Sequence, residues 1–336
     1  MKKRGAIGVG FNWIFAMIVG AIILFIALYF ASKVIGVGET QAGTESAARL
    51  VSVFDPLETG LALEKSLKVD LKRKTKIEFS CDSSSNRPFG RQRLRVAEKG
   101  FGSDYGEWGY EVSLNNKYVF SDKIIEGENF YIFSQAFFMG FKVSDINIMG
   151  SEDYCFYQAP NRIKRDIQNL GVDKFRFTES LSDSDLKNCS GRLVCFESEN
   201  NKCDMIVKGE CNDLRVCEDS YDYGRVLKNG GQSILYYADS LVYGAIFSGE
   251  DIYECNVIRI MNRLSELSDI YRGKADLLQG KGCRLNIGDK IRIMQGFVDG
   301  EISSNNFDSS DLINVHDLAR EADLMNKGAR GECEVY

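Results

Sequence analysis

One uncharged stretch near the N-terminus constrains this chain more than any other feature. Residues 6–32 carry no charged side chain and are rich in Ile, Leu, Val and Phe. At a rise of about 1.5 Å per residue, a helix of this length measures about 40 Å and exceeds the ~30 Å hydrocarbon core of a bilayer. The sequence therefore predicts a single transmembrane helix. A removable secretory signal is the alternative, but its apolar region is only about 7–15 residues long.

The charges that flank this stretch predict its orientation. Lys2, Lys3 and Arg4 precede it, whereas only Lys33 follows closely. Because positive residues stay on the cytoplasmic side, we expect residues 1–5 in the cytoplasm and the C-terminal domain outside the cell membrane. The lipid bilayer is thus the first predicted partner. A formal net charge of −6 and the lack of a basic domain argue against nucleic acid as a second one.

All ten cysteines lie beyond the uncharged stretch. An even number of cysteines in a domain predicted to be exported is typical of disulfide bonds. Zinc sites usually contain close pairs such as C-x2-C, and the sequence has none, so we expect no metal and no cofactor. The disulfide candidates are Cys81, Cys155, Cys189, Cys195, Cys203, Cys211, Cys217, Cys255, Cys283 and Cys333.

Spacing favours one pairing among these cysteines. The polar run 197–201 between Cys195 and Cys203 predicts a hairpin turn about Glu199. Such a turn would place the two cysteines opposite each other on neighbouring strands. We therefore expect a Cys195–Cys203 disulfide.

Another pairing is excluded by length. Apolar periodicity predicts a helix over residues 251–278, which separates Cys255 from Cys283. Such a helix holds the two cysteines about 35–40 Å apart. Disulfide-bonded cysteines have Cα atoms only about 4.4–6.8 Å apart, so each of these two needs another partner.

The whole pattern predicts an α+β fold, with one transmembrane helix followed by a disulfide-rich mixed ectodomain that ends in two helices. In the connector, Gly36, Gly38 and Gly43 are expected to loosen the chain before a short helix over 44–54. The predicted segments are residues 1–5 (cytoplasmic), 6–32 (transmembrane helix), 33–63 (connector), 64–150 (mainly β subdomain) and 151–336 (cysteine-rich α+β subdomain).

Several local elements follow from the hydrophobic patterns. Asn115-Asn116 between two apolar runs predicts a β-hairpin, and residues 136–139 a short helix. Residues 234–247 are apolar but too short to span a membrane, so we expect a buried helix there. The two C-terminal helices are expected over 251–278 and 310–325.

The sequence marks no enzyme. It contains no Walker A motif and no G-x-S-x-G elbow. His316, the single histidine, lies in a predicted helix where we expect a solvated residue; a hydrolase that uses it as a base is the weakest hypothesis, because no nucleophile is marked. The acidic pairs Asp183/Asp185 and Asp308/Asp311 lack the ligand order of an EF-hand, so we interpret them as loop or N-cap residues.

Three arginines form a possible docking patch. Arg91, Arg93 and Arg95 alternate along one predicted strand and therefore share a face. They could bind an acidic surface polymer or partner. The alternative, which we favour, is a solvated strand face whose charge discourages edge pairing.

The extreme N-terminus carries a recognisable pattern of residues, Lys3-Arg4-Gly5-Ala6-Ile7-Gly8-Val9-Gly10, followed by Ile14-Phe15-Ala16-Met17. This pattern resembles the class III signal segment of archaeal type IV pilins and archaellins. The resemblance implies that a membrane peptidase cuts after Gly5, which follows Arg4, and leaves Ala6 as the first residue. It also implies that the apolar helix is kept as the packed core of a filament. Phe11-Asn12-Trp13 departs from the family's aliphatic run.

These observations give two functional hypotheses. The first is a single-pass, archaeal-type cell-surface protein with a structural, pilin-like or adhesive role. Its helix would self-associate through small residues, which permit close helix packing: Gly8, Gly10, Ala16, Gly20 and Ala21. The alternative is a membrane-tethered extracellular receptor or binding module that does not polymerise. The ligand is not indicated by the sequence.

Overall fold

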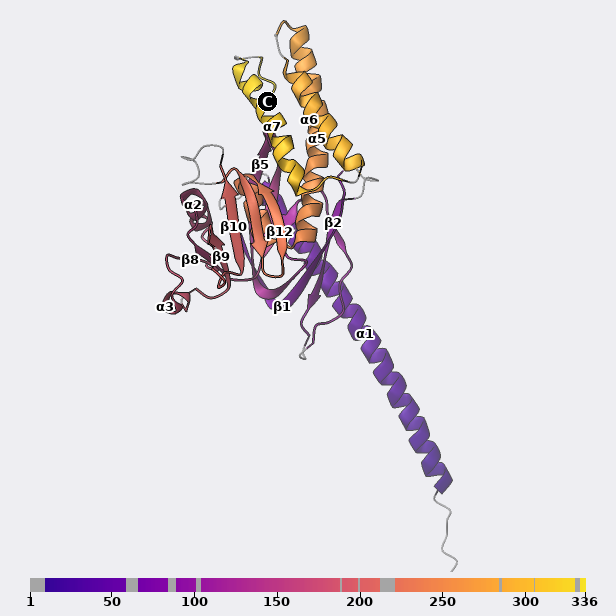
Figure 1. The fold of residues 1–336 in the computed structure, drawn as a ribbon. Coiled ribbons are helices and arrows are strands. Elements are labelled where there is room, and N and C mark those ends of the chain that lie inside the picture. Colours follow the sequence, from indigo (N-terminus) through magenta and orange to yellow (C-terminus); the bar gives the residue numbers. More distant parts are fainter. Residues whose placement is uncertain are drawn as a thin grey trace, which may run out of the picture.

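The structure is a computed structural model that describes residues 10–58, 66–83, 89–100, 104–187, 189–198, 200–211, 221–283, 286–304, 306–329 and 333–336. It confirms a mixed α and β fold with a long apolar N-terminal helix (Figure 1). The described helices are α1 (Gly10–Glu58), α2 (Asn161–Asn169), α3 (Asp183–Leu186), α4 (Ala238–Phe247), α5 (Glu250–Gly280), α6 (Ile287–Ser303) and α7 (Leu312–Gly328), with the 3-10 helix η1 (Ser309–Asp311).

The first sheet has six strands in the order β3-β2-β1-β5-β6-β4. Neighbouring strands are antiparallel except β4 and β6, which are parallel. Ile77 and Phe79 of β1 and Leu94 and Val96 of β2 are buried, which is the alternation expected of a sheet with one face in the core. The strands are β1 (Ser66–Asp82), β2 (Arg91–Glu98), β3 (Val112–Leu114), β4 (Val119–Phe120), β5 (Ile124–Met139) and β6 (Phe141–Gly150).

Two local predictions in this sheet are wrong. No hairpin forms at residues 115–116, because β3 pairs with β2 while β4 pairs with β6 at the opposite edge of the sheet. The expected short helix over 136–139 belongs to β5. Phe137 and Met139 are buried there while Phe138 is exposed, which is the two-residue period of a strand.

The second sheet has six strands in the order β12-β11-β10-β9-β7-β8. The strands β8, β7, β9 and β10 are parallel neighbours, whereas β10, β11 and β12 are antiparallel. They are β7 (Tyr154–Tyr157), β8 (Phe175–Thr178), β9 (Arg192–Phe196), β10 (Met205–Glu210), β11 (Tyr223–Lys228) and β12 (Gln232–Tyr237). The hairpin expected between Cys195 and Cys203 is wrong, because the strands beside them, β9 and β10, run parallel.

Helix α4 lies between the two sheets, which explains why most of its residues are apolar. It contacts β5 and β6 of the first sheet and β11 and β12 of the second. All its residues from Ser240 to Phe247 are buried. At Gly244 an added Cβ would lie 2.8 Å from the ring of Phe120, so only glycine allows this approach. The buried helix predicted over 234–247 is confirmed for Ala238–Phe247, and the preceding residues belong to β12.

Helix α1 is unbroken from Gly10 to Glu58, so the predicted loose connector with its separate helix over 44–54 is wrong. Its C-terminal part packs on β2, β3 and β5, and Ala47, Leu50 and Phe54 are buried there. A Cβ at Gly43 would lie 2.5 Å from the carbonyl oxygen of Val96. This glycine therefore does not loosen the chain; it lets the helix approach the sheet.

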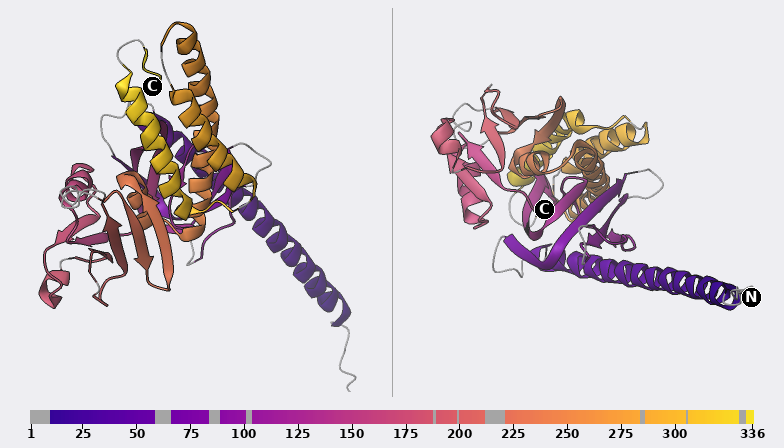
Figure 2. Two further views of the ribbon diagram at one scale, coloured as in Figure 1. Left: turned by 45° about the horizontal axis from the view of Figure 1, so that its top comes forward. Right: turned by 90° about the horizontal axis from the view of Figure 1, so that it is seen from below.

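The C-terminal part contains three long helices rather than the two expected. Helices α5 and α7 confirm the two predicted ones, and α6 lies between them in the chain. The sequence reading overlooked α6 although Ile287, Ile291, Met294 and Val298 recur at helical spacing and are buried. The ends of α5, α6 and α7 project beyond the sheets, at the opposite end of the molecule from the start of α1 (Figures 1 and 2).

Buried Arg259 fastens α5 to the first sheet. Its Nε donates to the carbonyl oxygen of Phe89 at 3.0 Å, and its Nη1 donates to the carbonyl oxygen of Lys117 at 3.1 Å and to Oδ1 of Asn256 at 2.7 Å. The guanidinium also lies 4.9 Å from the ring centre of Tyr118. No carboxylate pairs with it in the part of the chain that the structure describes. Burial lowers the pKa of Arg259 to about 10, so it stays charged at neutral pH.

Candidate functional site

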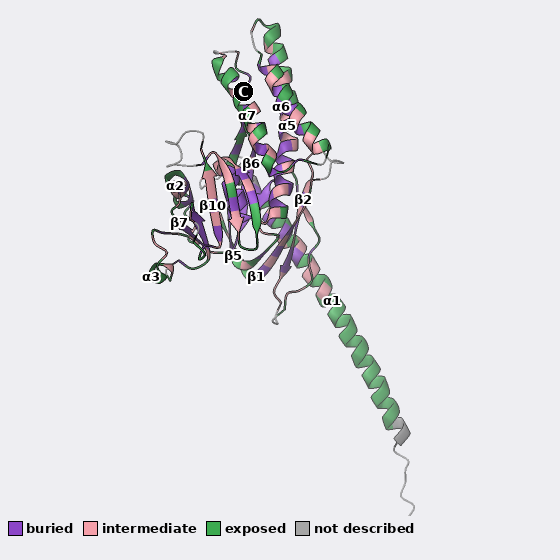
Figure 3. Ribbon diagram, in the orientation of Figure 1, coloured by how far each residue is buried: buried purple, intermediate pink, exposed green. Residues whose placement is uncertain are grey.

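The exposed half of α1 is the most unusual surface of the molecule (Figure 3). Every residue over 13–35 is exposed, including Phe25 at 72% and Leu28 at 62%. Isolated apolar side chains on a surface are ordinary, but a continuous apolar surface of this size needs a partner. By length and composition, this helix could cross a membrane.

The structure describes some of the predicted helix-packing residues but none of the predicted cleavage-site residues. Arg4, Gly5, Ala6 and Gly8 lie outside the described residues. Gly10 is the first residue of α1, and Ala16, Gly20 and Ala21 lie in its exposed half. No atom lies within 4 Å of the place that a Cβ of Gly20 would occupy, so the described chain does not cover this side of the helix.

Four disulfides join pairs of described cysteines in the part of the chain that follows α1. The expected Cys195–Cys203 bond is present, with Cα atoms 5.9 Å apart, and so is Cys155–Cys189, at 5.5 Å. In both pairs one cysteine lies on a parallel strand of the second sheet, β9 or β7, and the other lies outside the strands.

The exclusion of a bond between Cys255 and Cys283 is confirmed. Cys255 of α5 pairs with Cys81 of β1, with Cα atoms 6.1 Å apart, and Cys283 pairs with Cys333 at 5.7 Å. Cys211 is also disulfide-bonded, and Cys217 lies outside the described residues. No cysteine among the described residues is free.

The arginine patch lies on β2, but its charges are largely compensated. Arg93 forms an ion pair with Glu111 at 2.7 Å. Arg95 pairs with Glu78, and its guanidinium lies 4.8 Å from the ring centre of Trp108. Arg91 is half-buried at the start of the same strand. This arrangement favours a charged strand face over an open docking patch for an anion.

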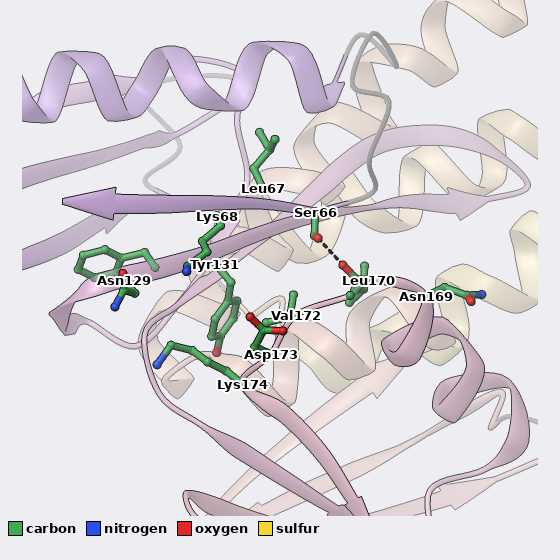
Figure 4. Close-up of a pocket in the computed structure, with 12 residues that line it drawn as sticks. Ser66, Leu67, Lys68, Asn129, Tyr131, Asn169, Leu170, Val172, Asp173 and Lys174 are labelled. Carbon is green, nitrogen blue, oxygen red and sulfur yellow. Dashed lines mark hydrogen bonds between the residues drawn. The ribbon is translucent and has the colours of Figure 1, made fainter.

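A cavity of about 610 Å³ lies where the two sheets meet (Figure 4). Leu67 and Tyr131 line it from the first sheet, and the turn after α2 lines it from the other side. The hydroxyl of Ser66 donates to the carbonyl oxygen of Leu170 at 2.5 Å and joins these two walls. Lys68 and Lys174 stand at the rim, but each pairs with a nearby aspartate, so the cavity carries no strong charge. No sequence motif had indicated it.

His316 lies in a second cleft, of about 780 Å³. We expected a solvated residue, but its ring stacks on that of Tyr237, with the ring centres 4.3 Å apart. Burial lowers the pKa of His316, so the ring is neutral at pH 7. The described lining of this cleft contains no serine, threonine or cysteine, and its hydroxyl groups belong to Tyr237, Tyr271 and Tyr336.

Asp308 is an N-cap residue, as we expected, but Asp183 and Asp185 lie within α3, whose N-cap is Ser182. The carboxylate of Asp308 accepts from the backbone N–H of Ser310 at 2.7 Å, and Asp311 accepts in return from the N–H of Asp308 at 3.2 Å. Asp183 pairs with Lys202 at 2.8 Å. The described part of the chain contains no group of three or more potential ligand residues able to hold a metal ion.

Asp239 is a largely buried carboxylate that was not among the predicted site residues. It lies in the first turn of α4, and its Oδ2 lies 3.0 Å from Nε of Arg162 on α2. Its Oδ1 is buried and has no hydrogen-bond partner among the described residues. Burial outweighs the attraction of Arg162 and raises the pKa of Asp239 to about 6.

This raised pKa predicts a stability that depends on pH. Between pH ~4 and ~6 the folded state keeps the proton that the unfolded state has lost, so the free energy of unfolding falls as the pH rises. Asp239→Asn removes this loss. We expect the stability of the variant relative to wild type to increase by about 1–3 kcal/mol from pH 4 to pH 7. Denaturant unfolding at both pH values measures it, and a difference that does not change with pH would contradict it.

Comparison with known proteins adds no relative. No family model, curated protein or solved structure matches the chain. The functional argument therefore depends on the geometry of α1, the disulfides and the clefts.

Proposed function

We propose that this chain is a single-pass cell-surface protein that the exposed half of α1 anchors in the membrane. The observation that carries the proposal is the contrast along one helix: residues 13–32 are exposed and carry no charge, whereas Ala47, Leu50 and Phe54 are packed in the ectodomain. A core helix of a soluble protein would be covered along its length. The described chain offers nothing to cover the first half, and a bilayer would.

The orientation has two supports. The basic residues Lys2, Lys3 and Arg4 favour a cytoplasmic N-terminus. Four disulfides favour an oxidising compartment for the ectodomain, because such bonds are rare in the cytosol. Both support an ectodomain on the outer side of the cell membrane.

Within this function we favour a structural, pilin-like or adhesive role. The resemblance of the N-terminus to archaeal pilins requires an apolar helix that stays with the mature protein, and an exposed helix continuous with the ectodomain suits that role. A tethered binding module is the second candidate, and the cavity between the sheets is the observation that favours it.

Mass spectrometry of the mature N-terminus tests the proposal. We expect a chain that begins at Ala6 and keeps the apolar helix. In a Gly5→Val variant we expect the unprocessed N-terminus at Met1, because the peptidase of the resembling family cuts after glycine.

Each other outcome has a definite meaning. A wild-type chain that has lost residues 1–32 would overturn the anchor itself. A mature chain that begins at Met1 would leave the anchor but remove the pilin-like role. Recovery of the protein in sheared filaments would exclude the non-polymerising module.

A further inference from the structure

The ectodomain begins almost directly above the predicted membrane span. The uncharged stretch ends at Ser32, and α1 continues without a break. At Gly36 the ectodomain already lies close to the helix, because an added Cβ would lie 3.8 Å from Cγ of Glu107. Four residues of helix rise only about 6 Å, which is within the headgroup layer of a bilayer. If α1 spans the membrane as proposed, the segment at Glu107 therefore lies among lipid headgroups.

An open groove of about 950 Å³ runs along α1 at this level. One wall of the groove is a face of α1. This face is concave because small residues recur on it every four positions, at Gly36, Thr40, Thr44 and Ala48. Its other wall is the segment that ends at Tyr110, whose backbone N–H donates to the Thr44 hydroxyl at 2.8 Å. The groove thus has a fixed wall on each side.

Aromatic side chains mark both ends of the groove. Tyr29 lines it at the membrane end, within the uncharged stretch. Tyr110 lines it from the ectodomain and is 74% exposed. Tyrosine is enriched where a protein meets the headgroup region, because its ring is apolar and its hydroxyl is polar, and this position fits Tyr29.

The charges of the groove are ordered along the helix axis. Lys33 lies at the membrane end, and none of the described carboxylates pairs with it. Glu107 is exposed and lies level with Gly36. Because Gly36 follows Lys33 by three helical residues, Glu107 lies about 4.5 Å farther along the helix axis from the membrane end than Lys33. The other glutamate of the lining, Glu45, is already paired with Arg49 at 2.5 Å. The groove therefore offers a cation near the bilayer and an anion above it.

We propose that this groove binds the headgroup of a zwitterionic phospholipid of the outer leaflet. In such a lipid the phosphate lies next to the glycerol and the ammonium two carbons farther out, which is the order of Lys33 and Glu107. An anionic headgroup without an ammonium would leave Glu107 facing negative charge, so the groove discriminates against it.

Fluorescence quenching in vesicles tests where the ammonium lies. The only two tryptophans, Trp13 and Trp108, are replaced with phenylalanine, and Tyr110→Trp supplies a single probe in the full-length chain. The vesicles contain phosphatidylcholine and phosphatidylglycerol, with a fraction of phosphatidylcholine that carries a nitroxide on its choline nitrogen. We expect at least about twofold quenching at position 110. Leu277→Trp in the same background, exposed at the far end of α5, should not be quenched.

Charge variants with matched controls test the recognition. Lys33→Gln and Glu107→Gln should each bring quenching at position 110 close to the level given by randomly distributed lipid. Lys123→Gln and Glu128→Gln remove the same charges from exposed residues outside the groove and should leave quenching unchanged. Phosphatidylcholine should also be enriched several-fold over phosphatidylglycerol in the lipid that co-purifies with wild type.

The outcomes separate this inference from the anchor on which it rests. A chain that fails to float with the vesicles refutes the anchor. A chain that floats, but shows no quenching or equal loss in all four charge variants, refutes the lipid site alone. Quenching that disappears as the protein-to-lipid ratio rises would assign the groove to a second copy of the chain and would also overturn the proposal.

Discussion

Replacing Ile22 and Phe25 with lysine should release the full-length chain from membranes into the carbonate-soluble fraction. Both side chains lie in the exposed half of α1, near the middle of the uncharged stretch. A lysine at the centre of a membrane helix costs about 2.5–3.5 kcal/mol, so the two together cost about 5–7 kcal/mol. The ectodomain should keep its fold, because nothing in the described structure packs on these two residues. Carbonate extraction followed by immunoblotting measures the shift.

The control places two lysines on the same helix outside the span. Ala42 and Ser52 are exposed in the part of α1 that accompanies the ectodomain, so Ala42→Lys/Ser52→Lys should stay in the membrane fraction. A wild-type chain that is itself soluble in carbonate would contradict the anchor. Retention of the Ile22→Lys/Phe25→Lys chain would do so as well.

Arg259→Met should lower the free energy of unfolding by about 3–5 kcal/mol. Methionine keeps much of the volume but makes none of the hydrogen bonds of the guanidinium. The buried carbonyl oxygen of Lys117, the partly buried carbonyl oxygen of Phe89 and the side chain of Asn256 would lose a charged donor at distances of 2.7–3.1 Å. Each buried group left without a partner costs about 1–3 kcal/mol. Guanidinium unfolding in detergent micelles, with disulfides intact, measures the loss.

Arg292→Met is the matched control for this variant. Arg292 pairs with Asp289 at 2.8 Å, but both side chains are about two-thirds exposed. Exposed ion pairs contribute only about 0–1 kcal/mol, so this variant should unfold near wild type. Equal stability of both variants would show that the network around Arg259 contributes little.

Sequence patterns that extend over many consecutive residues gave the most accurate structural predictions. The uncharged stretch became the exposed half of α1, and regular apolar spacing gave α5 and α7. The distance argument that excluded Cys255–Cys283 also succeeded, because the length of a helix depends only on the number of its residues.

Short sequence motifs did not reveal which strands and helices contact each other in the folded chain. The run between Cys195 and Cys203 does turn and the disulfide forms, but whether the flanking strands pair parallel or antiparallel depends on the rest of the sheet. Glycine was also ambiguous. Gly43 read as a loosening residue, yet it is required by the sheet beside it, which the sequence does not reveal.

The candidate sites were the least predictable part. The groove between α1 and Tyr110 joins residues far apart in the chain, and none of them belongs to a motif. His316 was placed on the correct helix, but its stacking on Tyr237 depends on how α7 meets the end of β12. Only the charge at Lys33 carried a signal, as the first charged residue after the apolar stretch.

The Cys81–Cys255 bond gives the molecule a mechanical property. It ties α5, whose far end projects from the sheets, to β1, and β1 pairs with β2, which packs on α1. A load applied at the projecting end would therefore reach α1 through a covalent link and paired strands of the described chain. If α1 spans a bilayer as proposed, a tilt of this helix would be passed along the same route to the far end of α5.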